Sequence, residues 1–369
     1  MQPSGKRQTA NGKRDRDACR LPDIKRGDFM KRAIVSVVLL FGCGALPARE
    51  QHIFILKQAQ DNVLLRAVAP SRYAPNVERL NLFRPSSVRA AHDTLYICDS
   101  GNNRLRVVDE HLNLITTFGR AGSGPGEMLN PGEIQLYGGV IGVLDSGNHR
   151  VNVYGRSGDY RFEFPLPALV RSFAFLDERK IVVPDETGEH AFVVVDSTGH
   201  LRRLGQRPPA VPGFQVAYPG ARKLMRGIGI DQVAVMDDTV YVADAVTGVI
   251  GSYATNGESL FNISPPLPLV RRMFDRFKKI DKGFGGHNVF SALYNEVSPT
   301  VDGKLFIVIS LADISALIVD PVERTVVVVN PPAHGDGDYA RHAGSVARVG
   351  TSMVFAAYAG IGFYDFGAR

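Results

Sequence analysis

The chain alternates short apolar runs with tight polar turns over most of its length. Between residues 81 and 164, stretches of alternating character such as 105–108 and 151–154 are separated by turns rich in Gly, Asp and Asn. Alternation with a period of two residues predicts half-buried β-strands rather than helices. We therefore expect an all-β chain built from meanders of about four strands each.

One hexapeptide occurs twice, as DSGNNR at residues 99–104 and as DSGNHR at residues 145–150. Each copy follows an apolar run and precedes an alternating one, which predicts strand, tight turn and strand. Weaker copies near positions 185, 244, 310 and 358 keep the hairpin rhythm, so the chain holds six units. Four-stranded units of this length stack radially into a β-propeller, an arrangement that protects the sheet edges.

The last unit runs out of chain near Phe366, after its third strand. The segment 52–57 has no unit of its own, and it predicts the missing outer strand of that final unit. The expected fold is thus a six-bladed β-propeller of four-stranded blades, closed by an N-terminal strand.

The two turns, the Arg that ends each of them, and the run 118–127 ahead of Pro131 resemble NHL repeats. The resemblance covers residues 81–164, and it implies a six-bladed propeller, in agreement with the count of units. In the later units the Asn and Arg of the turn are absent. Family-wide roles of the turn therefore apply to the first two blades only.

The recurring turn residues are interpreted as structural. Asp caps free backbone N–H groups, Gly accepts positive φ, and a following Arg pairs with the carboxylate. A catalytic residue is needed once per site, whereas a residue that recurs in successive blades serves the blade. The structural set is Asp99, Arg104, Asp145 and Arg150, and the turn tips predicted to contact a ligand are Asn102, Asn103, Asn148 and His149.

An amphipathic basic helix interrupts the repeats after residue 268. Apolar residues at positions 270, 273, 274, 277 and 280 share one face, and Arg271 and Arg272 lie among the basic residues around it. One interpretation packs the apolar stripe on the propeller and leaves the charges in water. The alternative is contact with an anionic partner, membrane headgroups included.

Positive charge is concentrated at the amino end of the chain. Residues 1–49 hold eleven Lys and Arg against four Asp, while the whole chain has a net charge of +6, so the remainder is close to neutral. A nucleic-acid surface needs concentrated Lys and Arg, so nucleic acid is not an expected partner.

Residues 30–48 have the order of a secretory signal, with a basic start, an apolar run and then small residues. Three segments are expected. Residues 1–29 are an over-extended or disordered amino terminus, residues 30–48 are a signal peptide, possibly of the lipoprotein type, and residues 50–369 are the propeller. Cys43 follows a lipobox-like sequence and is the candidate lipidation site, with simple cleavage or a retained anchor as alternatives. The expected location is periplasmic, free or as a membrane-anchored lipoprotein.

The leading hypothesis is an exported binding or scaffold module for a protein, peptide or glycan partner, acting as a monomer without a cofactor. An enzyme is the less favoured interpretation. That alternative is a metal-dependent lyase or lactonase, activities known among proteins of similar fold, with Ca²⁺ or Zn²⁺ in the central channel. Its candidate oxygen donors on the inner strands are Glu133, Asn295 and Glu296. A second cluster, for which a surface turn is the simpler account, is His334, Asp336, Asp338 and His342.

Overall fold

The structure is a computed structural model, and it describes residues 52–59, 63–67, 78–211, 228–229, 231–283, 293–300, 302–311, 313–331, 343–349, 352–357 and 360–366. The strands all belong to one unit, Glu50–Arg369. The predicted leader segments 1–29 and 30–48, with Cys43, lie outside the described residues, and so does the candidate cluster at 334–342.

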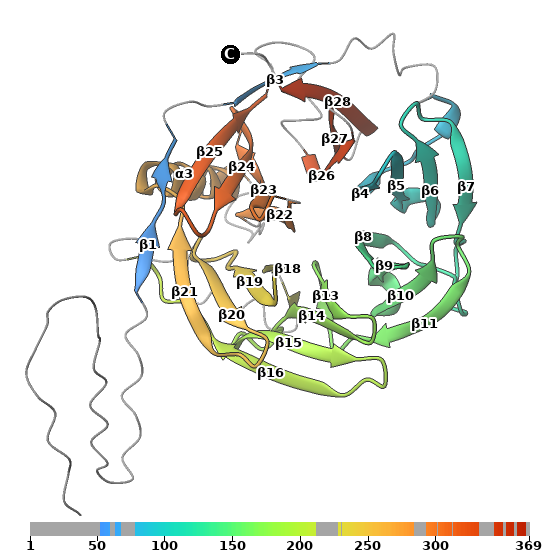
Figure 1. Ribbon diagram of the computed structural model, residues 1–369, viewed down its shortest axis with the longest axis horizontal. Coiled ribbons are helices and arrows are strands. Elements are labelled where there is room, and N and C mark those ends of the chain that lie inside the picture. Colours follow the sequence, from blue (N-terminus) through green and yellow to red (C-terminus); the bar gives the residue numbers. More distant parts are fainter. Residues whose placement is uncertain are drawn as a thin grey trace, which may run out of the picture. The chain divides into compact units, whose positions relative to one another are not determined.

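Six antiparallel four-stranded sheets, the blades, are arranged as a ring (Figure 1), and we call the middle of this ring, where the innermost strands lie, the channel. Blade 1 is β4 (Pro85–Ala91), β5 (Thr94–Asp99), β6 (Arg104–Asp109) and β7 (Leu114–Phe118), with the innermost strand first. Blade 2 is β8 (Pro131–Tyr137), β9 (Val140–Asp145), β10 (Arg150–Gly155) and β11 (Tyr160–Pro165). Blade 3 is β13 (Ala174–Asp177), β14 (Lys180–Pro184), β15 (His190–Asp196) and β16 (Leu201–Gln206).

The second half of the ring repeats the same order. Blade 4 is β18 (Gln232–Met236), β19 (Thr239–Ala243), β20 (Ile250–Ala254) and β21 (Ser259–Ser264). Blade 5 is β22 (Tyr294–Pro299), β23 (Leu305–Leu311), β24 (Ile314–Asp320) and β25 (Thr325–Asn330). Blade 6 contributes β26 (Ala343–Val349), β27 (Ser352–Ala357) and β28 (Gly360–Phe366) from the end of the chain. The predicted count of six units is confirmed.

An N-terminal strand closes the ring, as expected, but the predicted segment was wrong. The fourth strand of blade 6 is β3 (Val63–Ala67), which pairs antiparallel with β28. The segment predicted for that position instead forms β1 (Ile53–Ile55), which adds in parallel to the outer strand of blade 4. After it, β2 (Lys57–Gln58) adds in parallel to the outer strand of blade 5. The amino end therefore runs along the outer edges of blades 4 and 5 before it completes blade 6 (Figure 1).

The apolar core is distributed between neighbouring blades. Tyr96 and Cys98 of blade 1 pack on Ile134 and Ile141 of blade 2, and comparable clusters join the following blades. The alternating residues of each strand reach the two neighbouring blades, so the central strands are buried on both faces. The ring therefore gains its stability from contacts between blades.

The predicted basic helix is present as α3 (Leu267–Gly283), between blades 4 and 5. Val270, Met273 and Phe274 are buried in the same cluster as Tyr294 and Leu311 of blade 5. The described part of the apolar stripe thus packs on the propeller, as the first interpretation expects, and contact of the basic face with an anionic partner stays a prediction. Within the described residues, no helix is both long and apolar enough to cross a membrane.

Candidate functional site

The two DSGN turns are held together by their Asp residues. Asp99 accepts the Phe83 N–H at 2.7 Å and pairs with the Arg104 guanidinium at 2.7 Å. In blade 2, Asp145 accepts the Leu129 N–H and pairs with Arg150 in the same way. The turn therefore fastens the start of each inner strand to the hairpin that follows it.

The Gly of this turn is required by a close backbone approach. The Gly101 N–H donates to the Phe83 carbonyl at 2.8 Å, and a Cβ at this position would lie 2.6 Å from the same oxygen. Two positions further, Asn103 has a φ of 53°, the left-handed conformation that Asn adopts more readily than most residues. The hexapeptide thus encodes a backbone geometry.

The turn tips predicted to contact a ligand are engaged largely within the protein. The Asn102 amide donates to Asp99 and the Asn148 amide donates to Asp145, at 2.9 and 2.8 Å. Asn103 accepts the N–H of Asn130 at 2.8 Å. His149 is exposed. Ligand contact by any of the four stays a prediction.

Blades 3 and 4 keep the Asp but take their Arg from elsewhere. Asp185 pairs with Arg203 of β16 at 3.2 Å. Asp244 pairs at 3.2 Å with Arg207, which follows β16 and also contacts Asp231 at 2.7 Å. Although the turn Arg is absent from these units, an Arg from another part of the chain therefore completes the same Asp–Arg pair.

The inner strands are joined by a repeated hydrogen bond, which we call the channel ring. In each case a side chain near the start of one inner strand accepts a backbone N–H from the next blade. The five bonds are Val88 N–H to Ser345, Ile134 N–H to Ser87, Phe173 N–H to Glu133, Val233 N–H to Ser172 and Val346 N–H to Glu296, at 3.1 to 3.3 Å. Gln232 occupies the corresponding position of blade 4, and all six ring side chains are buried.

Glu133 and Glu296 extend further into the channel than the serines of the ring. Each uses one carboxylate oxygen for the ring bond and turns the other toward the Arg89 guanidinium, at 3.1 Å for Glu133 and 2.8 Å for Glu296. Arg89 also donates to the Val88 carbonyl and to Ser345. One buried arginine from blade 1 therefore connects blades 2, 5 and 6 across the channel.

Burial, with a smaller contribution from the neighbouring Glu296 carboxylate, raises the pKa of Glu133, and the net value is about 7. Three contacts act in the opposite direction: the Arg89 charge, the Phe173 N–H and the Gln135 amide. Because one guanidinium faces two carboxylates, its charge compensates only part of the cost of burying both. Glu133 consequently exchanges its proton near neutral pH.

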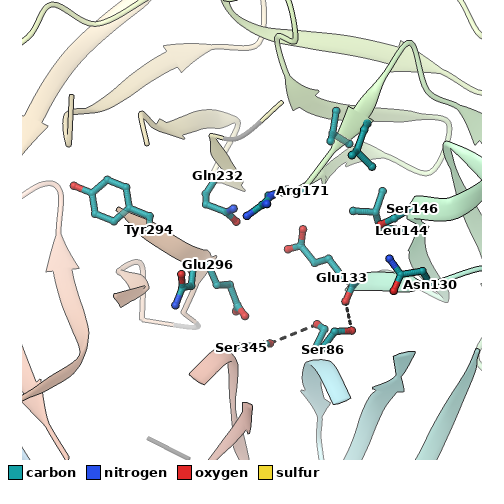
Figure 2. A pocket seen from close by; sticks show the side chains of 15 residues that line it. Ser86, Asn130, Glu133, Leu144, Ser146, Arg171, Gln232, Tyr294, Glu296 and Ser345 are labelled. Atoms are coloured by element: carbon teal, nitrogen blue, oxygen red, sulfur yellow. Dashed lines mark hydrogen bonds between the residues drawn. The ribbon is translucent and has the colours of Figure 1, made fainter. Parts of the chain in front are cut away.

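A pocket of about 550 Å³ opens at the end of the channel where the ring side chains lie (Figure 2). All six blades or their entry segments contribute to its wall, which is lined by Ser86, Ser87, Asn130, Gly132, Glu133, Leu144, Ser146, Leu169, Val170, Arg171, Gln232, Tyr294, Asn295, Glu296 and Ser345. Ser146 belongs to the turn of blade 2, so the pocket and the DSGN turns share one face. The volume falls in the range of small-molecule sites, roughly 300–1,000 Å³.

The three predicted metal donors lie on the inner strands and line this pocket, as expected. They do not fit a metal ion, because the Arg89 guanidinium already occupies the position between Glu133 and Glu296 where a cation would have to lie. Among the described residues, no group of three or more His, Cys, Asp or Glu could hold a metal. Ca²⁺ needs six to eight oxygen ligands, a number that this set does not supply.

The sequence reasoning missed two arginines that the described residues place at the channel, Arg89 and Arg171. Arg89 stands four residues after Pro85, at an inward position of an alternating inner strand, and a charge there is a signal that could have identified it. Arg171 precedes β13 and has no comparable local signal. Arg271 and Arg272, the helix residues predicted to bind a partner, lie on α3, where both are exposed and Arg272 pairs with Asp313, and binding by either stays a prediction.

Comparison with protein families gives one match, to a family described as a 6-bladed beta-propeller (DUF5128), over residues 77–191. The protein is a six-bladed β-propeller. The match covers blades 1 and 2 and the first part of blade 3, and the strand topology extends the same architecture to the rest of the ring. Comparison with curated proteins gives no match.

Solved propeller structures resemble the chain at low identity. Virginiamycin B lyase from Staphylococcus aureus has 11% identity and a TM-score of 0.47, covering 77% of this chain and 85% of its own. A gluconolactonase from Xanthomonas campestris has 10% identity and a TM-score of 0.48, covering 86% and 99%. A protein of unknown function from Bacteroides thetaiotaomicron has 13% identity and a TM-score of 0.48, covering 85% and 75%. No argument about activity rests on these likenesses.

Proposed function

We propose that this propeller is a binding module that takes part of a protein, peptide or glycan partner into the pocket at the end of its channel. The observation that carries the proposal is the convergence of five inner strands, and of the segment that leads into the sixth, on a pocket of about 550 Å³. A pocket with a few directed polar groups and an apolar side is the usual form of a recognition site.

The pocket is suited to recognition because its wall is rigid. The channel ring fixes the inner strands to one another, and Arg89 connects blades across the channel. A preorganised wall reduces the ordering cost of binding, since few side chains have to be immobilised when the ligand arrives. Glu133 and Glu296 add to the rigidity of this wall, because both carboxylates pair with Arg89.

The proposal includes export of the module, and this part of it is supported only by the sequence of residues 30–48. Lipidation at Cys43 would hold the propeller at a membrane surface, and cleavage would release it. In both cases the partner would be an extracytoplasmic protein, peptide or glycan.

The test is a substitution that fills the pocket. The full chain, immobilised, is screened against a glycan array and a synthetic peptide library, and the ligands found are measured again with Ser146→Trp. The matched control is Ser157→Trp, which changes an exposed serine in the turn at the opposite end of blade 2. Circular dichroism checks that both variants are folded.

A ligand that binds the unchanged protein and the control, but binds Ser146→Trp at least about tenfold more weakly, supports the proposal. A tenfold loss corresponds to about 1.4 kcal/mol of binding free energy. Ligands that bind all three proteins equally would place recognition elsewhere on the propeller, and the pocket would lose its assigned role.

A further inference from the structure

Among the described residues, one arginine of the pocket has no counter-ion. Glu133 and Glu296 both face Arg89. Arg171 is exposed, lines the pocket, and makes no ion pair or hydrogen bond with any part of the chain that the structure describes. In Figure 2, Arg171 and Gln232 lie on one side of the pocket, opposite Ser86 and Ser345. A guanidinium facing a cavity with no counter-ion favours an anionic ligand group.

The backbone on both sides of Arg171 is fixed. The preceding residues form β12 (Leu169–Val170), which pairs in parallel with β17 (Ile228–Gly229). The next two residues both take part in the channel ring, Ser172 as an acceptor and Phe173 as a donor. Arg171 is thus a flexible side chain on a rigid base, as a preorganised anchor requires.

The wall next to Arg171 is apolar. Leu169 and Val170 immediately precede it, and Leu144 of blade 2 lines the same pocket. Leu169 is 37% exposed, so part of its side chain is available for contact. Beyond these residues, Asn130 and Ser146 supply polar groups (Figure 2). The pocket therefore combines a cation, an apolar side chain next to it in the chain, and hydrogen-bonding groups.

We infer that the pocket recognises the carboxyl terminus of a peptide whose last side chain is apolar. The inference rests on the proposed function and specifies its ligand. Arg171 binds the terminal α-carboxylate through two parallel N–H donors, and the last side chain covers Leu169 and its neighbours. The main-chain amide of the last residue faces Asn130 and Ser146.

A sugar acid would also offer a carboxylate, but it fits the wall less well. A uronate presents hydroxyl groups around its ring, and those directed at the exposed part of Leu169 would lose their hydrogen bonds to water without replacement. A C-terminal Leu, Phe or Val has an apolar side chain in the position where the wall is apolar. This complementarity favours the peptide.

The experiment uses the full chain and fluorescein-labelled hexapeptides of the form Gly-Gly-Ser-Gly-Ser-X, where X is Leu, Phe, Val, Asp or Lys. Each is made with a free carboxylate and as the C-terminal amide, and binding is measured by fluorescence polarisation. A labelled oligouronate serves as the second probe. The variants are Arg171→Gln and Arg171→Lys, with Arg179→Gln as the matched control, an exposed arginine at the β13–β14 turn of the same blade.

The expected result is binding of the free acids that end in Leu, Phe or Val, weakened about 10- to 100-fold by amidation. Arg171→Gln should weaken the free acids by a similar factor and leave the amides unchanged. Arg171→Lys should retain part of the affinity, and Arg179→Gln all of it.

Three results would overturn the inference. Equal binding of acids and amides, or an equal loss of both in Arg171→Gln, would show that the carboxylate is not recognised. Binding of the oligouronate alone, dependent on Arg171, would make the ligand a glycan. In either case a loss of binding in Ser146→Trp would leave the proposed function intact. Binding of no probe would remove the peptide inference, and the proposed function would also fail if the broader screen found no pocket ligand.

Discussion

Glu133→Gln is expected to flatten the pH dependence of stability between pH 5 and pH 8. Gln has nearly the same shape as Glu, and its carbonyl oxygen can still accept the Phe173 N–H of the channel ring. Arg89 keeps Glu296 as its partner. The substitution therefore removes the titration of a buried carboxyl group while it preserves the main contacts of the site.

The magnitude follows from the pKa of Glu133, which burial raises from 4.5 to about 7. A raised pKa means that the folded protein holds this proton more tightly than the unfolded chain does. The stabilising contribution is therefore complete below about pH 4.5 and is lost as the pH rises through about 7. Between pH 5 and pH 8, the free energy of unfolding should fall by about 2–3 kcal/mol from this group.

The assay is urea unfolding followed by circular dichroism at pH 5, 6, 7 and 8. The quantity compared is the difference in unfolding free energy between the two proteins at each pH, so that other titrating groups cancel. Relative to the unchanged protein, Glu133→Gln should gain about 2–3 kcal/mol from pH 5 to pH 8. At every pH the variant should also lose about 1–3 kcal/mol of unfolding free energy, because the new amide N–H group would face the N–H donors of Arg89 and Gln135.

The matched control is Glu163→Gln, on the outer strand of the same blade, where the carboxylate is 39% exposed. It should show no comparable change with pH. A difference that stays constant from pH 5 to pH 8 in Glu133→Gln would refute the reasoning, because Glu133 would then titrate outside this range.

Two further predictions concern the fold. Asp145→Ala should lower the free energy of unfolding by about 3 kcal/mol, since it leaves Arg150 and the Leu129 N–H without their buried acceptor. In urea unfolding, the exposed control Asp159→Ala should lower the same quantity by under about 1 kcal/mol. Equal losses in the two variants would contradict the capping role of Asp145. Leu65→Pro should lower the midpoint of thermal unfolding and speed proteolysis, because proline cannot donate a backbone hydrogen bond within β3. An unchanged midpoint would contradict the closure of the ring by this strand.

The DSGN turns could be predicted from sequence because every contact that defines them is local or nearly so. Asp99 and Arg104 are five residues apart, and Gly101 meets the carbonyl of Phe83 just ahead of the same blade. In blades 3 and 4 the same reasoning found the Asp and missed its partner. Arg203 lies within β16 and Arg207 just after it, so no fixed spacing from the Asp marks them.

The closing strand shows how chain path overrides local pattern. Residues 52–57 and 63–67 are both short and rich in apolar residues, and nothing in their composition assigns either one to blade 6. The earlier segment is taken up along blades 4 and 5 on the way around the ring. Only the route of the backbone decides which segment meets β28.

The sequence by itself determined the strands, the six units and the turns of the first two blades, because alternation, Gly and Asp act over a few residues. It also placed Glu133 and Glu296 on inner strands. Only the tertiary structure brought these residues to one buried arginine and left Arg171 facing the pocket. The physical reason is that the channel is formed by one side chain from each of several blades. Their sequence separations are set by loop lengths, whereas their contacts are set by the closure of the ring.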